Sequence, residues 1–185
     1  MELEHEQELV ERAREDDAAF VTLYDFYFPK IYAYVYKRCG HQQTAEDVVS
    51  VAFTKVFTGL GTYNAQSGSF KAWVYRIATN VLIDHYRKQG RRPKEAEIPE
   101  GYDIEHKDAE RADDRVDRKI DRGRIEHVLK QLPEKDQEIL QLKFFAELSN
   151  IEIAQALGIS ANNAGVRVYR SLKAFKKQYQ SYVEA

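Results

Sequence analysis

The residues whose side chains are best suited to specific chemical contacts lie near the end of the chain. They belong to a stretch from Ile153 to Val183 that contains no acid. Asn162, Asn163 and Arg167 carry amide and guanidinium groups, which can make paired hydrogen bonds to adenine and guanine edges. Cations further along such a helix would meet phosphates. The outward-facing set is Asn162, Asn163, Val166, Arg167, Arg170, Lys173 and Lys177. This set predicts contact with the major groove of DNA; a solvated basic helix face is the alternative.

Two helices must position these side chains. Ser149-Asn150-Ile151-Glu152 matches a capping box, in which the Ser oxygen and the Glu carboxylate accept hydrogen bonds from backbone amides. A short helix over about 150–157, Gly158 at the corner and Ser160 as the next cap predict a helix-turn-helix. The second helix is predicted to pack through one apolar stripe, formed by Ala161, Ala164, Val168, Leu172, Phe175 and Tyr179.

The N-terminal half predicts further helices and no strand. Apolar spacing indicates one from Asp17 to Arg38, with a kink or short break at Pro29 and an end at Gly40. Thr44 is predicted to cap the next helix. After a loop rich in Gly, Ser, Asn and Thr, a third helix is expected from about Phe70 to Gln89.

Charge divides the chain of 185 residues, whose formal net charge is −2. Residues 71–94 carry seven Lys/Arg and one acid, whereas 95–117 carry ten acids and three Lys/Arg. Two basic segments separated by an acidic one suggest two surfaces for a polyanion. We therefore expect an all-α protein of two small helical domains, 1–92 and 119–185, joined by a flexible acidic linker at 93–118.

Several function classes lose support from the composition. Cys39 is the single cysteine, and the five histidines show no HxxxH or HExxH spacing, so we expect no metal site and no intrachain disulfide. Glycine-rich phosphate loops and the GxSxG motif are missing, which argues against an enzyme and against a cofactor. No apolar run approaches the ~20 residues of a membrane span, and the start has no secretory h-region. A cytoplasmic protein is expected.

Five segments together carry a resemblance to a known family. They are AFVTLYDFYFPKIYAYVYKRCG, AEDVVSVAFTKVF, FKAWVYRIATNVLIDHYRKQGRRP, LPEKDQEILQLKFFAELSNIEIAQALGIS and VRVYRSLKAF. In this order, over nearly the whole chain, they resemble the extracytoplasmic-function (ECF) group of bacterial RNA polymerase sigma factors. The resemblance implies a non-enzymatic subunit that binds core RNA polymerase and directs it to promoters.

The resemblance also implies roles for particular residues. The helix that docks on the clamp helices of the polymerase's largest subunit would use Asp47, Val48, Val49, Phe53, Lys55 and Val56. The part that melts the −10 promoter element would use Tyr63, Lys71, Trp73, Tyr75, Arg76, Asn80, Asp84, Arg87 and Lys88. Melting captures an unstacked base, for which aromatic platforms, polar edges and a cationic track are suited. Trp73 is equally well interpreted as core.

The helix-turn-helix would then read the −35 element. From their names the two elements lie about 25 base pairs apart, which is roughly 85 Å of duplex. The 34 residues of 90–123 would span at most ~110 Å when extended, so the linker can just bridge them. Expected partners are promoter DNA as duplex and as melted single strand, the clamp helices and flap region of core polymerase, and an anti-sigma factor.

The chain departs from the family pattern in places, and two other functions stay open. Ser50, Val51 and Ala52 stand where the family commonly has polar residues, which makes the clamp helix more apolar. One alternative is a helix-turn-helix regulator that binds DNA alone, with a sensor or dimerisation domain before it. The other is a helical adaptor whose basic faces bind acidic proteins. An adaptor would lack DNA affinity that falls steeply with salt.

Overall fold

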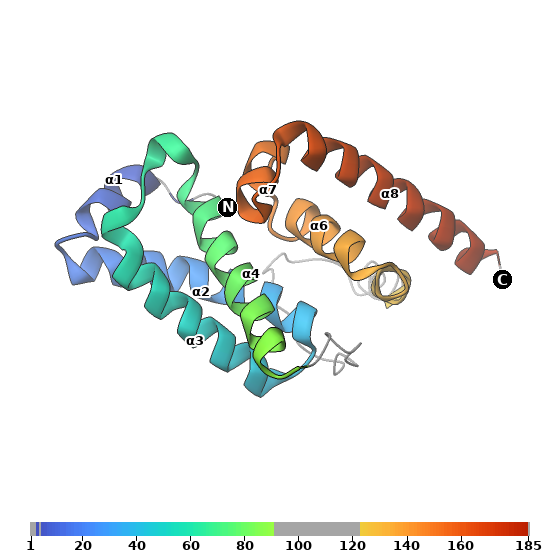
Figure 1. The fold of residues 1–185 in the computed structure, drawn as a ribbon, viewed down its shortest axis with the longest axis horizontal. Helices are drawn as coiled ribbons and strands as arrows, with labels where there is room; N and C mark the ends of the chain where they lie inside the picture. The colour runs from blue at the N-terminus through green and yellow to red at the C-terminus, as the bar shows by residue number, and fades with distance from the viewer. Residues whose placement is uncertain (1–2, 4, 91–122, 185) are drawn as a thin grey trace, which may run out of the picture.

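The computed structural model describes residue 3, residues 5–90 and residues 123–184. The predicted linker, residues 93–118, lies entirely outside these ranges. Every regular element within them is a helix, as the sequence predicts. We call residues 5–90 the N lobe and residues 123–184 the C lobe (Figure 1). None of the helices in the described ranges has the length and apolar content that a membrane crossing requires.

The N lobe is a bundle of long helices with a short helix across one end. Its elements are α1 (Glu6–Arg12), α2 (Asp17–Cys39), α3 (Gln42–Gly59), the 3-10 turns η1 (Leu60–Thr62) and η2 (Ala65–Ser67), and α4 (Phe70–Lys88). Between α2, α3 and α4 the side chains of Tyr27, Ile31, Val48, Tyr75 and Leu82 are at most 2% exposed. Burial of these large apolar side chains holds the bundle together.

Of the predicted kink or short break at Pro29, the break is wrong, because α2 runs through it from Asp17 to Cys39. A proline inside a helix removes one backbone hydrogen bond to the carbonyl four residues earlier. Pro29 and Asp25 are both exposed, so water can hydrate that carbonyl. Tyr27 and Ile31 are buried on either side of the proline, and their packing keeps the helix continuous. The predicted end at Gly40 is confirmed: its φ is 61°.

The predicted cap at Thr44 is also wrong. Helix α3 begins at Gln42, and its N-cap is His41, whose Nδ1 accepts a hydrogen bond from the Thr44 backbone amide at 3.3 Å. Histidine is not among the residue types favoured at N-caps, so the usual pattern points to Thr44 instead.

The C lobe is helical over residues 123–130 and continues through α6 (Glu134–Phe144), α7 (Asn150–Leu157) and α8 (Ala161–Val183). Helix α8 packs against α6 and α7 (Figure 1), and near its far end the Tyr182 ring lies 4.9 Å from the ring of His127. The interior of this lobe is formed mainly by Ile139, Leu142, Leu148, Ile153 and Ala164.

The two lobes are in direct contact. Helix α4 of the N lobe packs against α7 of the C lobe, and buried apolar residues form one continuous cluster that includes both lobes. Figure 1 shows α7 beside the start of α4. The helix-turn-helix is therefore held next to the segment that the resemblance assigns to the −10 element.

Candidate nucleic-acid interface

The helix-turn-helix is formed by the local rules that its sequence indicates. The capping box is present: Ser149 Oγ accepts from the Glu152 amide at 3.2 Å, and Glu152 Oε2 accepts from the Ser149 amide at 2.8 Å. Gly158 ends α7 in the left-handed region at φ 65°, which glycine adopts without steric cost. Ser160 then caps α8 by accepting from the Asn163 amide at 3.2 Å. These three predictions are confirmed.

The predicted outward face of α8 is exposed along its whole length. Its seven residues, Asn162, Asn163, Val166, Arg167, Arg170, Lys173 and Lys177, are all exposed in the structure. Tyr169 joins this face with 67% of its side chain exposed, although the sequence analysis did not single it out. An aromatic residue with cations close to it on the same face was the available signal. The arrangement offers amide and guanidinium donors near the start of α8 and cations behind them, as groove binding requires.

The predicted inward stripe of α8 is only partly correct. Ala164 and Ser171 are fully buried, while Ala161 is exposed and Leu172 is 42% exposed. The Ser171 hydroxyl donates a hydrogen bond to Asp136 Oδ1 of α6, so a small polar residue occupies the place expected for leucine. Ser171 is fully buried where α8 packs on α6. This is why apolar spacing alone selects the wrong neighbour.

The residues predicted for melting divide into a covered and an exposed group. Tyr63 and Tyr75 are 8% and 2% exposed, and the Tyr63 hydroxyl donates to the Gly68 carbonyl at 2.9 Å. Trp73 is half-buried, with its ring 5.3 Å from that of Tyr63 and 5.6 Å from that of Phe70. Arg76, Asn80, Arg87 and Lys88 are exposed on α4, and Lys71 and Asp84 are partly so. The two tyrosines proposed as stacking platforms are therefore buried, whereas the cationic side chains along α4 are exposed.

The residues predicted for polymerase contact divide in the same way. Val48, Val49, Phe53 and Val56 are at most 6% exposed and hold α3 in the bundle, whereas Asp47 and Lys55 face solvent. Of the unusual triplet, Val51 is 48% exposed and Ala52 is buried.

An open aromatic groove lies beside these residues, between α2 and α3. It measures about 410 Å³ and is lined by Phe20, Tyr24, Phe28, Glu46, Val49, Ser50, Phe53, Thr54 and Phe57. Phe57 is 50% exposed. The sequence does not indicate that Phe20, Tyr24 and Phe28 stay partly accessible or that Phe57 is exposed, because aromatic residues at helical spacing also fit a core. Exposed aromatic residues of this kind commonly mark protein contacts.

Polar contacts join the two lobes around the start of α4. Ser69, the N-cap of α4, donates from Oγ to Glu152 Oε1 at 2.7 Å, and Lys71 Nζ donates to the Glu147 carbonyl at 3.3 Å. Burial acts to raise the pKa of Glu152, but hydrogen bonds from the Ser149 amide and the Ser69 hydroxyl outweigh it, so that pKa lies below its usual value. The Glu152 carboxylate is therefore held ionised between two helix starts.

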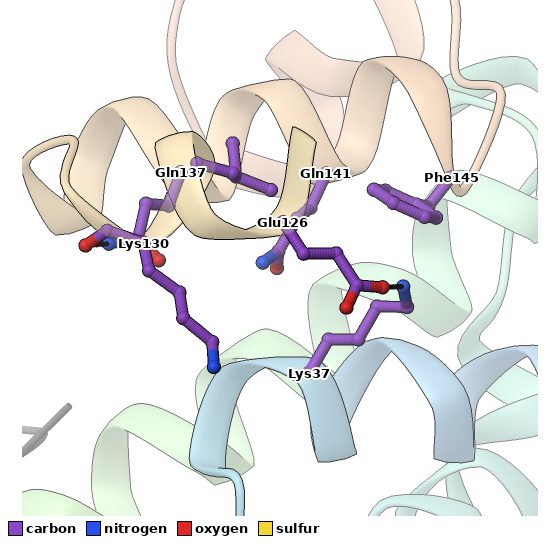
Figure 2. A pocket seen from close by; sticks show the side chains of 7 residues that line it. Lys37, Glu126, Lys130, Gln137, Gln141 and Phe145 are labelled. Atoms are coloured by element: carbon purple, nitrogen blue, oxygen red, sulfur yellow. Dashed lines mark hydrogen bonds and ion pairs between the residues drawn. The ribbon is translucent and has the colours of Figure 1, made fainter. Parts of the chain in front are cut away.

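Further contacts lie at the other end of α4, between α2 and the C lobe. Arg38 and Glu138 form an ion pair at 2.7 Å with side chains only 13% and 16% exposed. Beside it, Lys37 pairs with Glu126 at 3.3 Å and lies 3.9 Å from the Phe145 ring centre (Figure 2). The space between these side chains is about 20 Å³, enough for roughly one water molecule.

Comparisons with known proteins show the family of the chain. Residues 23–92 match the model of Sigma-70 region 2, and residues 122–175 match that of Sigma-70, region 4. The RNA polymerase sigma-H factor of Pseudomonas aeruginosa is 32% identical, over 96% of this chain and 95% of that protein. The ECF RNA polymerase sigma factor SigW of Bacillus subtilis is 30% identical, over 96% and 98%. The chain belongs to the ECF group of RNA polymerase sigma factors.

This ECF sigma factor is accordingly a non-enzymatic protein of promoter-specific transcription initiation. Its chain spans 64% of another relative, the ECF sigma factor BldN of Streptomyces coelicolor, at 31% identity over 92% of this chain. Its fold is that of CnrH, solved with the cytosolic domain of CnrY (TM-score 0.68, 19% identity, 95% and 97% of the two chains). It is also that of RpoE, solved with the anti-sigma factor NepR from Bartonella quintana (0.65, 17%, 87% and 96%).

Proposed function

We propose that this sigma factor reads the −35 promoter element with α8 and melts the −10 element with the N lobe. The observation that carries the proposal is the outward face of α8, where all seven predicted residues are exposed and no acid occurs from Ile153 to Val183. Asn162, Asn163 and Arg167 would contact base edges, and Arg170, Lys173 and Lys177 would contact phosphates.

The −10 function rests on α4 and the loop before it. Arg76, Asn80, Arg87 and Lys88 form an exposed cationic and polar track along α4, which suits a single strand. Tyr63 and Tyr75 are covered in this structure, so their use as stacking platforms requires a local rearrangement when DNA is bound. Trp73 would then support the loop before α4 through its ring contacts with Tyr63 and Phe70.

Core polymerase is the partner proposed for the surface of α3. Asp47 and Lys55 supply exposed charges there, and the aromatic groove between α2 and α3 supplies apolar area next to them. The clamp helices of the largest subunit would bind this surface, and the flap region would bind the C lobe. Val48, Val49 and Val56 would act by fixing the helix from inside.

An anti-sigma protein is a further proposed partner. Of the two structures with this fold, RpoE was solved with the anti-sigma factor NepR, and CnrH was solved with the cytosolic domain of CnrY. The cytoplasm, where polymerase works, is the proposed location. Residues 1–92, 93–118 and 119–185 remain the proposed division into −10 domain, linker and −35 domain.

Run-off transcription with purified core polymerase and a pool of genomic promoters tests the proposal. We expect transcripts from a small set of promoters that appear only when this protein is added. Specific duplex binding without core, together with no transcripts, would instead support a regulator that acts alone. Binding to acidic proteins and no salt-steep DNA affinity would support an adaptor.

A further inference from the structure

We propose that Arg14 is a positioning residue for recognition of the −10 element: from the turn after α1 it fixes the backbone of the α3–α4 loop, residues 60–69. The proposal rests on the proposed function, which assigns this loop to the melted strand. Arg14 acts through Tyr63 and not by contact with the DNA.

The contact joins two segments that are far apart in the sequence. Arg14 Nη2 donates a hydrogen bond to the Tyr63 carbonyl at 2.8 Å, although the two residues are 49 positions apart. The same nitrogen lies 3.2 Å from Glu11 Oε1, and the Arg14 side chain is only 32% exposed. Hydrogen bonds from a charged donor are stronger than those between neutral groups. Glu11 therefore orients the guanidinium, and the guanidinium ties the loop to the segment before α2.

The segment that carries Arg14 is itself anchored in the N lobe. Val10 and Ala13 are 1% and 5% exposed, and the Tyr27 hydroxyl of α2 donates a hydrogen bond to the Glu6 carboxylate. These contacts do not involve Arg14. Its substitution should therefore release the loop and leave α1 packed.

Tyr63 is the residue through which the loop is held. Besides the carbonyl bound by Arg14, its hydroxyl donates to the Gly68 carbonyl at 2.9 Å, and its ring lies 5.4 Å from that of Phe70. Burial and the nearby glutamates raise the pKa of Tyr63 against the opposing effect of Arg14, so the hydroxyl stays a neutral donor. The loop is thus tied at Tyr63 through both the backbone and the side chain.

These two ties respond differently when the tyrosine ring moves. Use of the Tyr63 ring as a stacking platform breaks the hydroxyl contact with Gly68, whereas the Arg14 contact is to the backbone and persists. Asn64, Gln66 and Ser67 are exposed on the loop, and their amide and hydroxyl groups suit the edge of an unstacked base. Arg14 then keeps these side chains in place and so preserves the base preference at −10.

Hydrogen exchange of the free full-length protein, measured by mass spectrometry, tests the positioning without polymerase or DNA. We expect amides of residues 61–69 to exchange several-fold faster in Arg14→Ala than in the wild type. Arg14→Lys, which keeps a cationic donor, should lie between them. Arg12→Ala is the matched control: it removes the same charge from α1, but Arg12 pairs with Asp16 at 3.1 Å, so loop exchange should match the wild type. Equal exchange in Arg14→Ala and Arg12→Ala would overturn the proposal.

Transcription by the reconstituted holoenzyme, on single-base variants of a promoter found by the run-off experiment, measures the functional consequence. In Arg14→Ala we expect preference among −10 variants to fall about tenfold, because a charge-assisted hydrogen bond that fixes the loop is lost. Preference among −35 variants and affinity for core polymerase should equal those of Arg12→Ala. A general structural defect would lower all three, and either that result or an unchanged −10 preference would overturn the positioning role. Absence of specific transcripts already in the wild type would overturn the proposed function, whereas the exchange result would still decide whether Arg14 fixes the loop.

Discussion

Glu152 has two structural roles: it caps helix α7, and it joins the C lobe to the N lobe. One carboxylate oxygen accepts from the Ser149 amide and so begins α7, while the other accepts from the Ser69 hydroxyl, which itself begins α4. The capping role follows from the spacing of Ser149 and Glu152, and the sequence predicts it. The second role depends on a residue more than eighty positions earlier, which no local pattern can indicate.

Replacement of Glu152 by Gln should lower thermal stability at pH 7, with an effect that disappears in acid. The pKa of Glu152 is depressed below 4.5, so its ionised form contributes stability above that value. This contribution is lost as the pH falls through the lowered pKa. Melting temperatures of wild type and Glu152→Gln between pH 7 and pH 3 should therefore converge at the acid end. A difference that stays constant with pH would show that charge is not involved.

Arg167 and Lys177 should behave differently although both are exposed cations on α8. Arg167→Ala is expected to relax one promoter base preference by about 1–3 kcal/mol, because a paired contact to guanine is lost. Lys177→Ala should weaken binding to all sequences alike and reduce the salt slope by about 1. Transcription from a set of single-base promoter variants checks both. Uniform effects from both substitutions would mean that another turn of α8 faces the bases.

At the scale of elements, helix positions were largely predictable and their packing was not. Caps and apolar spacing correctly indicate α4, α7 and the Gly158 corner, since these depend on residues close in sequence. The errors at Pro29 and Leu172 arise where tertiary packing overrides a local rule. The outward face of α8 follows from helical periodicity. The burial of the candidate aromatic residues cannot be predicted from periodicity, because it depends on the neighbouring helices.

Gly158→Ala should destabilise the C lobe by about 1–2 kcal/mol through backbone strain alone. Gly158 has a φ of 65°, which costs an L-residue roughly that amount, and a Cβ there would contact nothing within 4 Å. Gly61→Ala is the control, since its Cβ also meets nothing and its backbone is not in the left-handed region. Urea unfolding compares the two. Equal losses of unfolding free energy would contradict the assignment of strain to the corner.

Phe57→Ser should weaken core polymerase binding several-fold without loss of helicity. Phe57 is half exposed at the edge of the aromatic groove, so its truncation removes apolar contact area but leaves no cavity in the core. Phe144→Ser on α6 changes an equally exposed phenylalanine away from the groove and serves as the comparison. Polymerase titration measures both. A larger effect at Phe144 would place the contact on the C lobe.

For the whole molecule, the decisive feature is the continuous core. Buried apolar residues of both lobes form one cluster, and a buried ion pair crosses the same boundary. A linker composition predicts two domains and leaves their arrangement open, because composition gives no sign of a contact between surfaces that pair only in three dimensions. The unequal charge distribution agrees with this packing: Lys37, Arg38 and Lys71 of the N lobe meet Glu126, Glu138 and a carbonyl of the C lobe.

Calorimetric unfolding of the wild type should accordingly show a single cooperative transition. The lobes stabilise each other while docked, so neither is expected to melt alone. In Glu138→Lys the heat absorption should divide into two transitions. Each should be broader than the single transition of the wild type, because each lobe is a smaller cooperative unit. Two separate transitions in the wild type would show that docking contributes little free energy.

The order of the contacts along the chain has a consequence for biosynthesis. Ser69, Lys71 and Arg38 are translated before Glu138, Glu147 and Glu152, and N-terminal domains generally fold first as a chain leaves the ribosome. The N lobe can therefore complete its bundle while its docking surface has nothing to bind. Every newly made molecule therefore passes once through a stage in which the C lobe is not docked on the N lobe. A polymerase or chaperone that binds the nascent chain at this stage binds the undocked form.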